Sequence, residues 1–221
     1  MTEDSYTFET LDTLGRKYIN NFGPLEKKEY KGGDKTTLRK GFTIRYDELF
    51  SPKRCDKINF LELGVFTGRS LAMWSDYFPN GTVYGIDIHL EMFKRAEPEL
   101  KNLGAFSNNN IKLIEIDNRS DEFKIMAKEF PMFDFIVDDA DHKSKSQFDN
   151  FMLLFPKLKS GGIYVIEDII TPGGVFSLFG EIMQGVSNQD HPTISKSIYS
   201  KIIRDISHIE IRSNNVIFFK N

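Results

Sequence analysis

The chain has 221 residues, a net charge of −3 and an apolar fraction of 40%. This length suits one well-packed domain with a small extension and leaves little room for two full domains. The composition excludes a disordered or fibrous chain, and the slightly acidic balance argues against a general nucleic-acid binder.

The N-terminus and the single cysteine bear on location. Residues Met1 to Tyr6 are acidic and lack the apolar core of a signal peptide. No apolar run approaches the roughly 20 residues of a membrane span. Because Cys55 has no second cysteine to pair with, a reducing compartment is the simpler interpretation. We therefore expect a cytoplasmic protein without a membrane span.

The first 55 residues carry helical signals around a lysine-rich segment. Apolar residues recur at helical spacing over residues 5–22 and stop at Gly23-Pro24. The following Glu26–Gly41 indicates a surface loop, and Tyr46–Phe50 indicates a short helix. We expect residues 1–55 to form a helical extension or lid and residues 56–221 to form the main domain. A plain solvated linker in the N-terminal part is an equally open interpretation.

From Asn59 onward, apolar segments of strand length alternate with amphipathic segments of helix length. The predicted strands are Asn59–Val65, Thr82–Ile88, Ile111–Asp117, Phe133–Asp139 and Gly161–Asp168. The predicted helices are Arg69–Phe78, Glu91–Leu100, Ser120–Phe130 and Ser144–Leu158. Near-continuous apolar strands separated by helices indicate a parallel sheet covered on both faces, with right-handed crossovers.

The C-terminal part breaks this pattern. After a helical stretch within Val175–Arg204, the segments His208–Arg212 and Val216–Lys220 alternate in polarity around Asn214-Asn215. Such a turn pair is typical of a hairpin. The predicted class is α/β: a Rossmann-like, doubly wound, mostly parallel seven-stranded sheet closed by a C-terminal antiparallel hairpin.

Acidic residues follow two neighbouring strands of this sheet. The run Phe133–Val137 ends in Asp138, Asp139, Ala140, Asp141 and His142, and Gly161–Ile166 ends in Glu167 and Asp168. In an open parallel sheet this edge binds ligands, and clustered carboxylates there hold a cation, share protons or repel one another. The sequence predicts a divalent-metal site with a base beside it. The alternative is that the first acids only cap the next helix and the later pair lies in a solvated loop.

The first strand runs into a glycine turn and then a helix, over Phe60–Gly68. This arrangement lets the backbone approach a nucleotide-like ligand closely, although such turns also occur for structural reasons alone. A dinucleotide fingerprint would need glycine at positions 66 and 71, where Phe66 and Leu71 stand. A hydride-transfer enzyme therefore fits poorly, and Glu62 within the strand is more typical of S-adenosylmethionine enzymes.

Acids also end the second and third strands. Asp87 can accept hydrogen bonds from the ribose hydroxyls of an adenosine, and Asp117 or Asn118 can meet the adenine edge. Each acid alone could simply cap the following helix. With Glu62 they place acids at three successive strands, which favours a cofactor site.

The chain resembles a known protein family over about residues 34 to 170. The residues that carry the resemblance are Leu61–Gly64, Val83–Asp87, Phe135–Asp139 through His142, Leu154–Pro156 and Gly161–Asp168. They are similar to the metal-dependent sugar O-methyltransferases of the mycinamicin 2″-O-methyltransferase type. The resemblance implies a class I methyltransferase fold, S-adenosylmethionine as methyl donor, and Mg²⁺ or another divalent cation such as Mn²⁺.

The resemblance also assigns roles to residues of this chain. It implies that Asp139, Glu167 and Asp168 bind the metal and that His142 is the base, with Asp139 also at the catalytic centre. The cofactor-binding residues it implies are Glu62, Gly64, Phe66, Gly68, Ser70, Asp87, Asp117, Asn118 and Asp138.

The chain departs from the family pattern at two places. Ala140-Asp141 replaces a more usual Gly-Ser pair, which adds negative charge next to the base. Asn118 stands where the family often has glutamine, which weakens a cofactor contact.

Three functions compete. The first is metal-assisted O-methylation of a sugar hydroxyl on a glycan, a glycoside or a nucleotide sugar. The second is the same chemistry on a catechol-like phenol, which ionises more readily and would need His142 less. The third is a methyltransferase-fold module that binds without catalysis, against which the retained acids and histidine argue. The sequence leaves open the acceptor, the hydroxyl position, the physiological metal, the role of residues 171–205 and whether the chain forms a homo-oligomer.

Overall fold

The computed structural model describes residues 8–19, 32–170, 172–188, 197–212 and 214–221. It divides into two compact units. The first comprises Met1–Lys57, Val65–Val83 and Leu90–Ile111, and the second comprises Ile58–Gly64, Tyr84–His89 and Lys112–Asn221. Each unit is described by itself.

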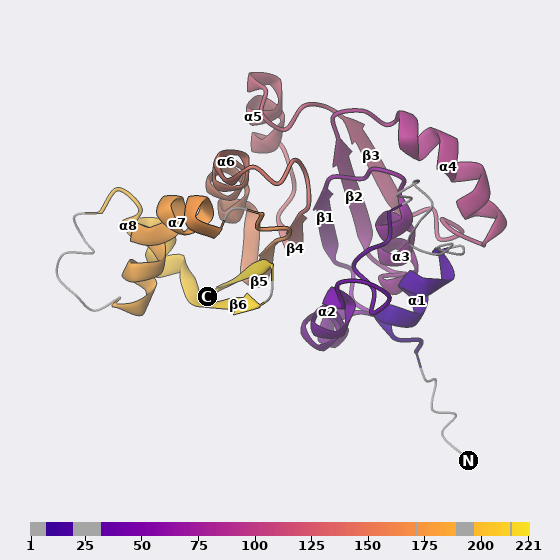
Figure 1. Ribbon diagram of the computed structural model, residues 1–221, viewed down its shortest axis with the longest axis horizontal. Coiled ribbons are helices and arrows are strands. Elements are labelled where there is room, and N and C mark those ends of the chain that lie inside the picture. Colours follow the sequence, from indigo (N-terminus) through magenta and orange to yellow (C-terminus); the bar gives the residue numbers. More distant parts are fainter. Residues whose placement is uncertain (1–7, 20–31, 171, 189–196, 213) are drawn as a thin grey trace, which may run out of the picture. The chain divides into compact units, whose positions relative to one another are not determined.

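The second unit is built on a seven-stranded sheet, to which the first unit supplies only the opening residues of β2 and β3. The strand order is β3-β2-β1-β4-β5-β7-β6, and Figure 1 labels each of these strands except β7. The strands are β1 (Asn59–Leu63), β2 (Thr82–Asp87), β3 (Ile111–Glu115), β4 (Phe133–Asp138), β5 (Leu158–Ile166), β6 (Ile206–Arg212) and β7 (Asn215–Lys220).

Register places several strand ends at one edge. β4 runs parallel to both β1 and β5, with Asp138 opposite Leu63 on one side and opposite Ile166 on the other. β7 runs antiparallel to β5 and to β6. The predicted α/β sheet, mostly parallel and closed by a C-terminal hairpin, is confirmed.

The predicted boundaries between the fourth helix and the fifth strand of the main domain were wrong for a local reason. The helix before β5 ends at Leu154 instead of Leu158, and β5 begins at Leu158 instead of Gly161. Pro156 lies in a 3-10 turn over Phe155–Lys157. Because proline has no backbone N–H, it cannot continue the helical hydrogen bonds. At its other end β5 stops at Ile166, two residues before the predicted end, so that Glu167 and Asp168 lie just beyond the strand.

Four helices accompany the sheet in the second unit: α5 (Asp121–Lys128), α6 (Ser144–Leu154), α7 (Pro172–Ser187) and α8 (Ser200–Asp205). α5 begins at Ser120, whose hydroxyl accepts the Phe123 N–H at 3.0 Å. α6 packs against α7, and rings from α6, α7 and β7 meet in the core. The ring centroid of Phe151 lies 5.1 Å from that of Phe179 and 4.4 Å from that of Phe218. Such contacts fix α6 on the sheet.

The first unit contains α1 (Leu11–Lys17), α2 (Phe42–Phe50), a 3-10 turn (Ser51–Lys53), α3 (Arg69–Tyr77) and α4 (Glu91–Asn102). The predicted helix over residues 5–22 is shorter, because it begins after the Thr10 cap and ends at Lys17. Residues 5–7 and 20–22 lie outside the described residues. The lid role of residues 1–55 stays a prediction. Among the described helices, none has both the length and the apolar character needed to cross a membrane.

One buried carboxylate ties the N-terminal segments of the first unit together. Asp12 on α1 accepts hydrogen bonds from the backbone N–H and hydroxyl of Thr37, both at 2.7 Å, and from the hydroxyl of Thr43 at 2.6 Å. It also pairs with Arg16 at 2.8 Å. Burial raises the pKa of Asp12, but these hydrogen bonds and the Arg16 charge outweigh burial, so that the pKa lies below its usual value.

Replacing Asp12 should therefore destabilise the protein near neutral pH. Asp12→Asn keeps the shape but loses the charge-assisted hydrogen bonds, at an expected cost of about 1–3 kcal/mol in the free energy of unfolding. Because the folded pKa is depressed, this contribution is present above the unfolded pKa and disappears as pH falls through the folded pKa. Denaturant titrations from pH 7 to pH 3 should show the two proteins converging. The control is Asp121→Asn at an exposed position. An equal loss of stability in that variant would refute the stabilising role of Asp12.

Candidate functional site

The ends of β4 and β5 carry the acids and the histidine that were singled out in the sequence. Backbone hydrogen bonds continue past both strands: the Asp139 N–H donates to the Leu63 carbonyl at 2.9 Å, and the Glu167 N–H donates to the Asp138 carbonyl at 2.9 Å. Asp139 and Asp168 therefore leave the sheet from adjacent strands at the same edge. His142 lies in the turn between β4 and α6.

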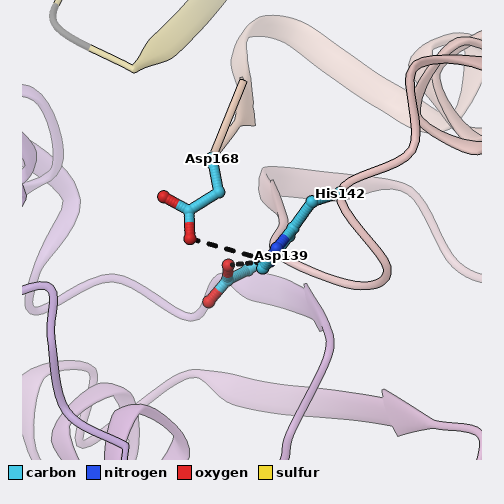
Figure 2. A group of neighbouring side chains, drawn as sticks. All are labelled: Asp139, His142 and Asp168. Carbon is cyan, nitrogen blue, oxygen red and sulfur yellow. Dashed lines mark hydrogen bonds and ion pairs between the residues drawn. The ribbon is translucent and has the colours of Figure 1, made fainter. Parts of the chain in front are cut away.

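Asp139, His142 and Asp168 form a cluster, which Figure 2 shows with their side chains converging. His142 Nε2 lies 3.1 Å from Asp139 Oδ1 and 3.7 Å from Asp168 Oδ2. One potential ligand atom from each residue lies within 4.8 Å of the others. All three side chains are partly exposed, so that a ligand can reach them.

Two members of this cluster have an uncommon backbone conformation. His142 has φ of 57° and Asp168 has φ of 52°. Both values lie in the left-handed region, which residues other than glycine rarely adopt. Such residues persist where the surrounding structure holds them, and they concentrate at functional sites. Both side chains have a potential ligand atom within 4.8 Å of one on Asp139.

The donor set suits a divalent cation. Two carboxylates held close together repel each other unless a cation or proton lies between them. Carboxylate oxygens are the ligands that Mg²⁺ and Mn²⁺ prefer, and imidazole nitrogen is a further ligand for the transition metals. The residues present therefore fit the metal that was predicted for this edge.

Glu167, the third predicted metal ligand, lies differently. Its side chain is fully buried, and it is outside the group of residues whose ligand atoms lie within 4.8 Å of one another. Its backbone carbonyl accepts a hydrogen bond from Gln147 Nε2 at 2.9 Å. The role of Glu167 as a ligand stays a prediction.

Asp138, a predicted cofactor contact, is buried at the end of β4. Its Oδ2 accepts hydrogen bonds from Asn150 Nδ2 at 2.9 Å and from the Tyr164 hydroxyl at 3.4 Å. Burial raises the pKa of Asp138 to about 7, although the hydrogen bonds from Asn150 and Ala140 act in the opposite direction. Its carboxylate is thus engaged by the protein, and its contact with a cofactor stays a prediction.

A pocket lies beside the cluster, at the ends of four strands. Its lining follows β1 (Leu63, Gly64), β2 (Ile86, Asp87, Ile88), β3 (Ile116, Asn118, Arg119) and β4 (Ala140, Asp141). Three predicted cofactor residues, Gly64, Asp87 and Asn118, are thus brought together. Asn118 Nδ2 is buried there without a hydrogen-bond partner among the described residues. Because an unpaired buried donor is costly, this atom suits a ligand that accepts a hydrogen bond.

Asp117 does not line this pocket. Arg119 binds its carboxylate with two contacts, Nε to Oδ1 at 2.8 Å and Nη2 to Oδ2 at 2.9 Å, and these contacts lower the pKa of Asp117. Arg119 Nη1 also lies 3.7 Å from Asp141 Oδ2. Sequence reasoning missed Arg119, although its position directly after Asp117-Asn118 placed it at the same strand end.

Asp141 binds groups close to the start of α6. Its carboxylate accepts hydrogen bonds from the Lys143 N–H at 3.1 Å and from the Ser146 hydroxyl at 3.0 Å. Lys143 is the residue that precedes the helix, and no side-chain capping hydrogen bond is found there. The capping interpretation is therefore wrong for Asp141, and the carboxylate that joins the cluster is that of Asp139.

The glycine turn after β1 depends on a close backbone approach. Gly64 has φ of 91°, and a Cβ there would lie 2.1 Å from the carbonyl oxygen of Asp139. Only glycine fits at that distance. Glu62, within β1, is fully buried.

The rest of the glycine turn belongs to the first unit, so its predicted residues are not placed against the pocket. Phe66 has φ of 50° and is exposed. The Gly68 N–H donates to the Val65 carbonyl at 2.8 Å, and Gly68 directly precedes α3, on which Ser70 lies. These residues form a tight turn into a helix N-terminus, as predicted, and their contact with a cofactor stays a prediction.

Comparison with known proteins gives a consistent result. A model of the O-methyltransferase family matches residues 53–192. Mycinamicin VI 2''-O-methyltransferase of Micromonospora griseorubida is 36% identical over 138 residues, which are 59% of this chain and 32% of that protein. The 8-demethyl-8-alpha-L-rhamnosyl tetracenomycin-C 2'-O-methyltransferase of Streptomyces olivaceus is 29% identical over 189 residues, 82% of this chain and 45% of that protein.

Among solved structures, the fold matches the MycE methyltransferase from the mycinamycin biosynthetic pathway in complex with Mg, SAH and mycinamycin VI. The TM-score is 0.72 at 26% sequence identity, over 96% of this chain and 54% of that chain. The chain thus spans between 32% and 54% of the length of these three relatives.

The geometry at Gly64 generates a matched pair of substitutions. Gly64→Ala should lower the free energy of unfolding by about 2–4 kcal/mol, because it adds backbone strain and a clash with the Asp139 carbonyl. Gly161→Ala is the control, since Gly161 also has positive φ, at 71°, but open space around its Cβ position. It should cost less, about 1 kcal/mol. Denaturant titration of both variants measures the difference, and equal costs would contradict the close approach.

Proposed function

The chain belongs to the O-methyltransferase family, and on that premise we propose that it transfers a methyl group from S-adenosylmethionine to a sugar hydroxyl with the help of a divalent cation. The observation that carries the proposal is the cluster of Asp139, His142 and Asp168 at the edge of the sheet, beside a pocket formed by four strand ends.

The pocket supports the cofactor part of the proposal. Asp87 lies at the end of β2, where a carboxylate can bind ribose hydroxyls, and its Oδ1 already accepts the His89 N–H at 3.1 Å. Asn118 offers its buried Nδ2 to an acceptor atom of the adenine ring. Gly64, which has no side chain, also lines the pocket and leaves room for a ligand to approach the backbone there. Phe66 and Leu71 occupy positions where a dinucleotide site needs glycine, so we favour S-adenosylmethionine over NAD.

Asp139 and Asp168 would hold the metal, with Glu167 as the further ligand that the family resemblance implies. A bound Mg²⁺ ion supplies positive charge that makes a nearby hydroxyl group more acidic. Mn²⁺ is compatible with the same oxygen donors.

His142 is the proposed general base. Its Nε2 faces the two carboxylates, which orient the ring and favour its positive charge after proton uptake. In the proposed reaction the neutral imidazole of His142 takes the proton of the acceptor hydroxyl. A C–O bond then forms to the methyl carbon while its bond to sulfur breaks. Apart from this proton transfer, the protein mainly aligns the reacting groups.

The names of the relatives support a sugar-bearing small molecule as acceptor. They name 2''-O-methylation for mycinamicin VI and 2'-O-methylation for a rhamnosyl tetracenomycin. The chain spans only part of these relatives, and a catechol-like phenol is the alternative acceptor. The cytoplasmic location and the oligomeric state stay predictions.

Asp139→Ala tests the metal part of the proposal. Removing one of the three proposed carboxylate ligands should weaken Mn²⁺ binding by at least about 10-fold and abolish turnover, while affinity for S-adenosylhomocysteine stays near that of the wild type. Calorimetry measures both affinities on the same preparation. Asp149→Ala is the control, because Asp149 is an exposed acid on α6 that pairs with Lys145. Turnover by Asp139→Ala at the wild-type rate would exclude the metal role.

His142→Ala separates a base from a metal ligand. A base contributes about 10²–10⁴-fold to kcat, so kcat should fall by that factor while the dissociation constant of Mn²⁺ changes little. His208→Ala, an exposed histidine on β6, should leave kcat unchanged. If His142→Ala instead loses Mn²⁺ affinity in parallel with kcat, His142 is a ligand and the proton leaves by another route.

A further inference from the structure

Helix α6 has two amide side chains on its buried face. Gln147 is 1% exposed and Asn150 is 2% exposed. They are three residues apart, so they lie next to each other on one side of the helix. Phe151 and Leu154 continue the same buried stripe into the core. Buried amides are costly unless they are hydrogen-bonded, so these two side chains need hydrogen-bond partners inside the protein.

Each amide binds the residue directly before a carboxylate of the cluster. Asn150 Nδ2 donates to Asp138 Oδ2 at 2.9 Å, and Asp138 precedes Asp139. Gln147 Nε2 donates to the carbonyl oxygen of Glu167 at 2.9 Å, and Glu167 precedes Asp168. One helix thus fastens the ends of two strands immediately before both carboxylates.

The two attachments are joined through the sheet. The Glu167 N–H donates to the Asp138 carbonyl at 2.9 Å. Three hydrogen bonds therefore connect Asn150 to Asp138, Asp138 to Glu167, and Glu167 to Gln147, and the backbone of α6 joins Gln147 to Asn150, so that the contacts form a closed circuit. A closed circuit resists displacement of any one member more than separate bonds do. Its geometry fixes the distance between the places where Asp139 and Asp168 leave the sheet.

The carboxylates need this support. Asp168 has a left-handed backbone, with φ of 52°, which the surroundings must maintain. Asp139 and Asp168 also carry like charges that repel each other when no cation lies between them. The two amide hydrogen bonds act against this repulsion, together with the backbone pairing of β4 and β5. His142, two residues before α6 begins, depends on the same helix.

We propose that Gln147 and Asn150 are positioning residues that hold Asp139 and Asp168 at the spacing required for a divalent cation. This inference rests on the proposed function, because it assigns the cation to these two carboxylates. The hydrogen bonds of the two amides go to the residues directly before the two carboxylates of the cluster. They act through the backbone of Glu167 and the side chain of Asp138.

The test uses substitutions that remove the hydrogen bonds and keep the volume: Gln147→Met and Asn150→Leu. The control is Leu154→Ala, which removes buried packing from the same face of α6 without a hydrogen bond. For each protein, Mn²⁺ affinity and S-adenosylhomocysteine affinity are measured by calorimetry, and stability is measured by denaturant titration. A cooperative unfolding transition in the denaturant titration verifies that a variant is folded.

We expect Gln147→Met and Asn150→Leu to weaken Mn²⁺ binding by about 10- to 100-fold, the usual effect of losing a partner that orients a metal ligand. Leu154→Ala should lose stability and keep the wild-type Mn²⁺ affinity. The inference is overturned if both amide variants bind Mn²⁺ as the wild type does, or if Leu154→Ala weakens binding equally. If Asn150→Leu does not fold, Gln147→Met decides alone. Failure of the wild type to bind Mn²⁺ would overturn the proposed function itself and this inference with it.

Discussion

In the parallel pair of β4 and β5, Asp138 lies opposite Ile166, and the hydrogen bond from the Glu167 N–H to the Asp138 carbonyl extends the pairing by one residue. All geometry of the candidate site depends on this register. Side chains alternate between the two faces of a strand, so a slip of one residue would turn one acid away from the other. The hairpin of β6 and β7 supports the register from the far side, because β7 pairs with β5 over Ile163–Ile166.

The site combines features that do not stabilise the fold. His142 and Asp168 have left-handed backbones, Gly64 approaches the Asp139 carbonyl closely, and two carboxylates share one small region. These costs are tolerated because the adjoining structure is strongly packed. In the second unit, Phe151, Phe179 and Phe218 bring α6, α7 and β7 into contact. Apolar burial there holds the helix whose amides reach the strand ends, and so links packing to site geometry.

Most of the fold could be predicted from the sequence, because strand and helix periods differ strongly in this chain. Boundaries were less predictable: Pro156 ended α6 early, and the Thr10 cap and the stop at Lys17 shortened α1. For the site, the acids after β4 and β5 indicated the edge correctly, and the structure brings Asp139, His142 and Asp168 together. Strand ends alone could not reveal that Arg119 binds the carboxylate of Asp117, or that Asp141 accepts a hydrogen bond from the Lys143 N–H just before α6. Those outcomes depend on which neighbour each side chain reaches.

Gln147 and Asn150 carried a signal that sequence reasoning passed over. They stand at helical spacing with Phe151 and Leu154, on the stripe that should be apolar in a core-facing helix. Polar residues on such a stripe must find partners inside the protein. The partners, at the ends of β4 and β5, became visible only when the sheet register was known.

The central claim is that the cluster and the neighbouring pocket together transfer a methyl group from S-adenosylmethionine with the help of a divalent cation. Incubating the purified protein with methyl-labelled S-adenosylmethionine and a panel of glycosides and nucleotide sugars, with Mg²⁺ or with excess chelator, tests it most directly. We expect label to pass to a sugar hydroxyl of at least one acceptor when Mg²⁺ is present, and transfer to stop when chelator removes the metal. Methyl transfer at an unchanged rate in excess chelator, or label passing to catechols but to no sugar, would contradict the account.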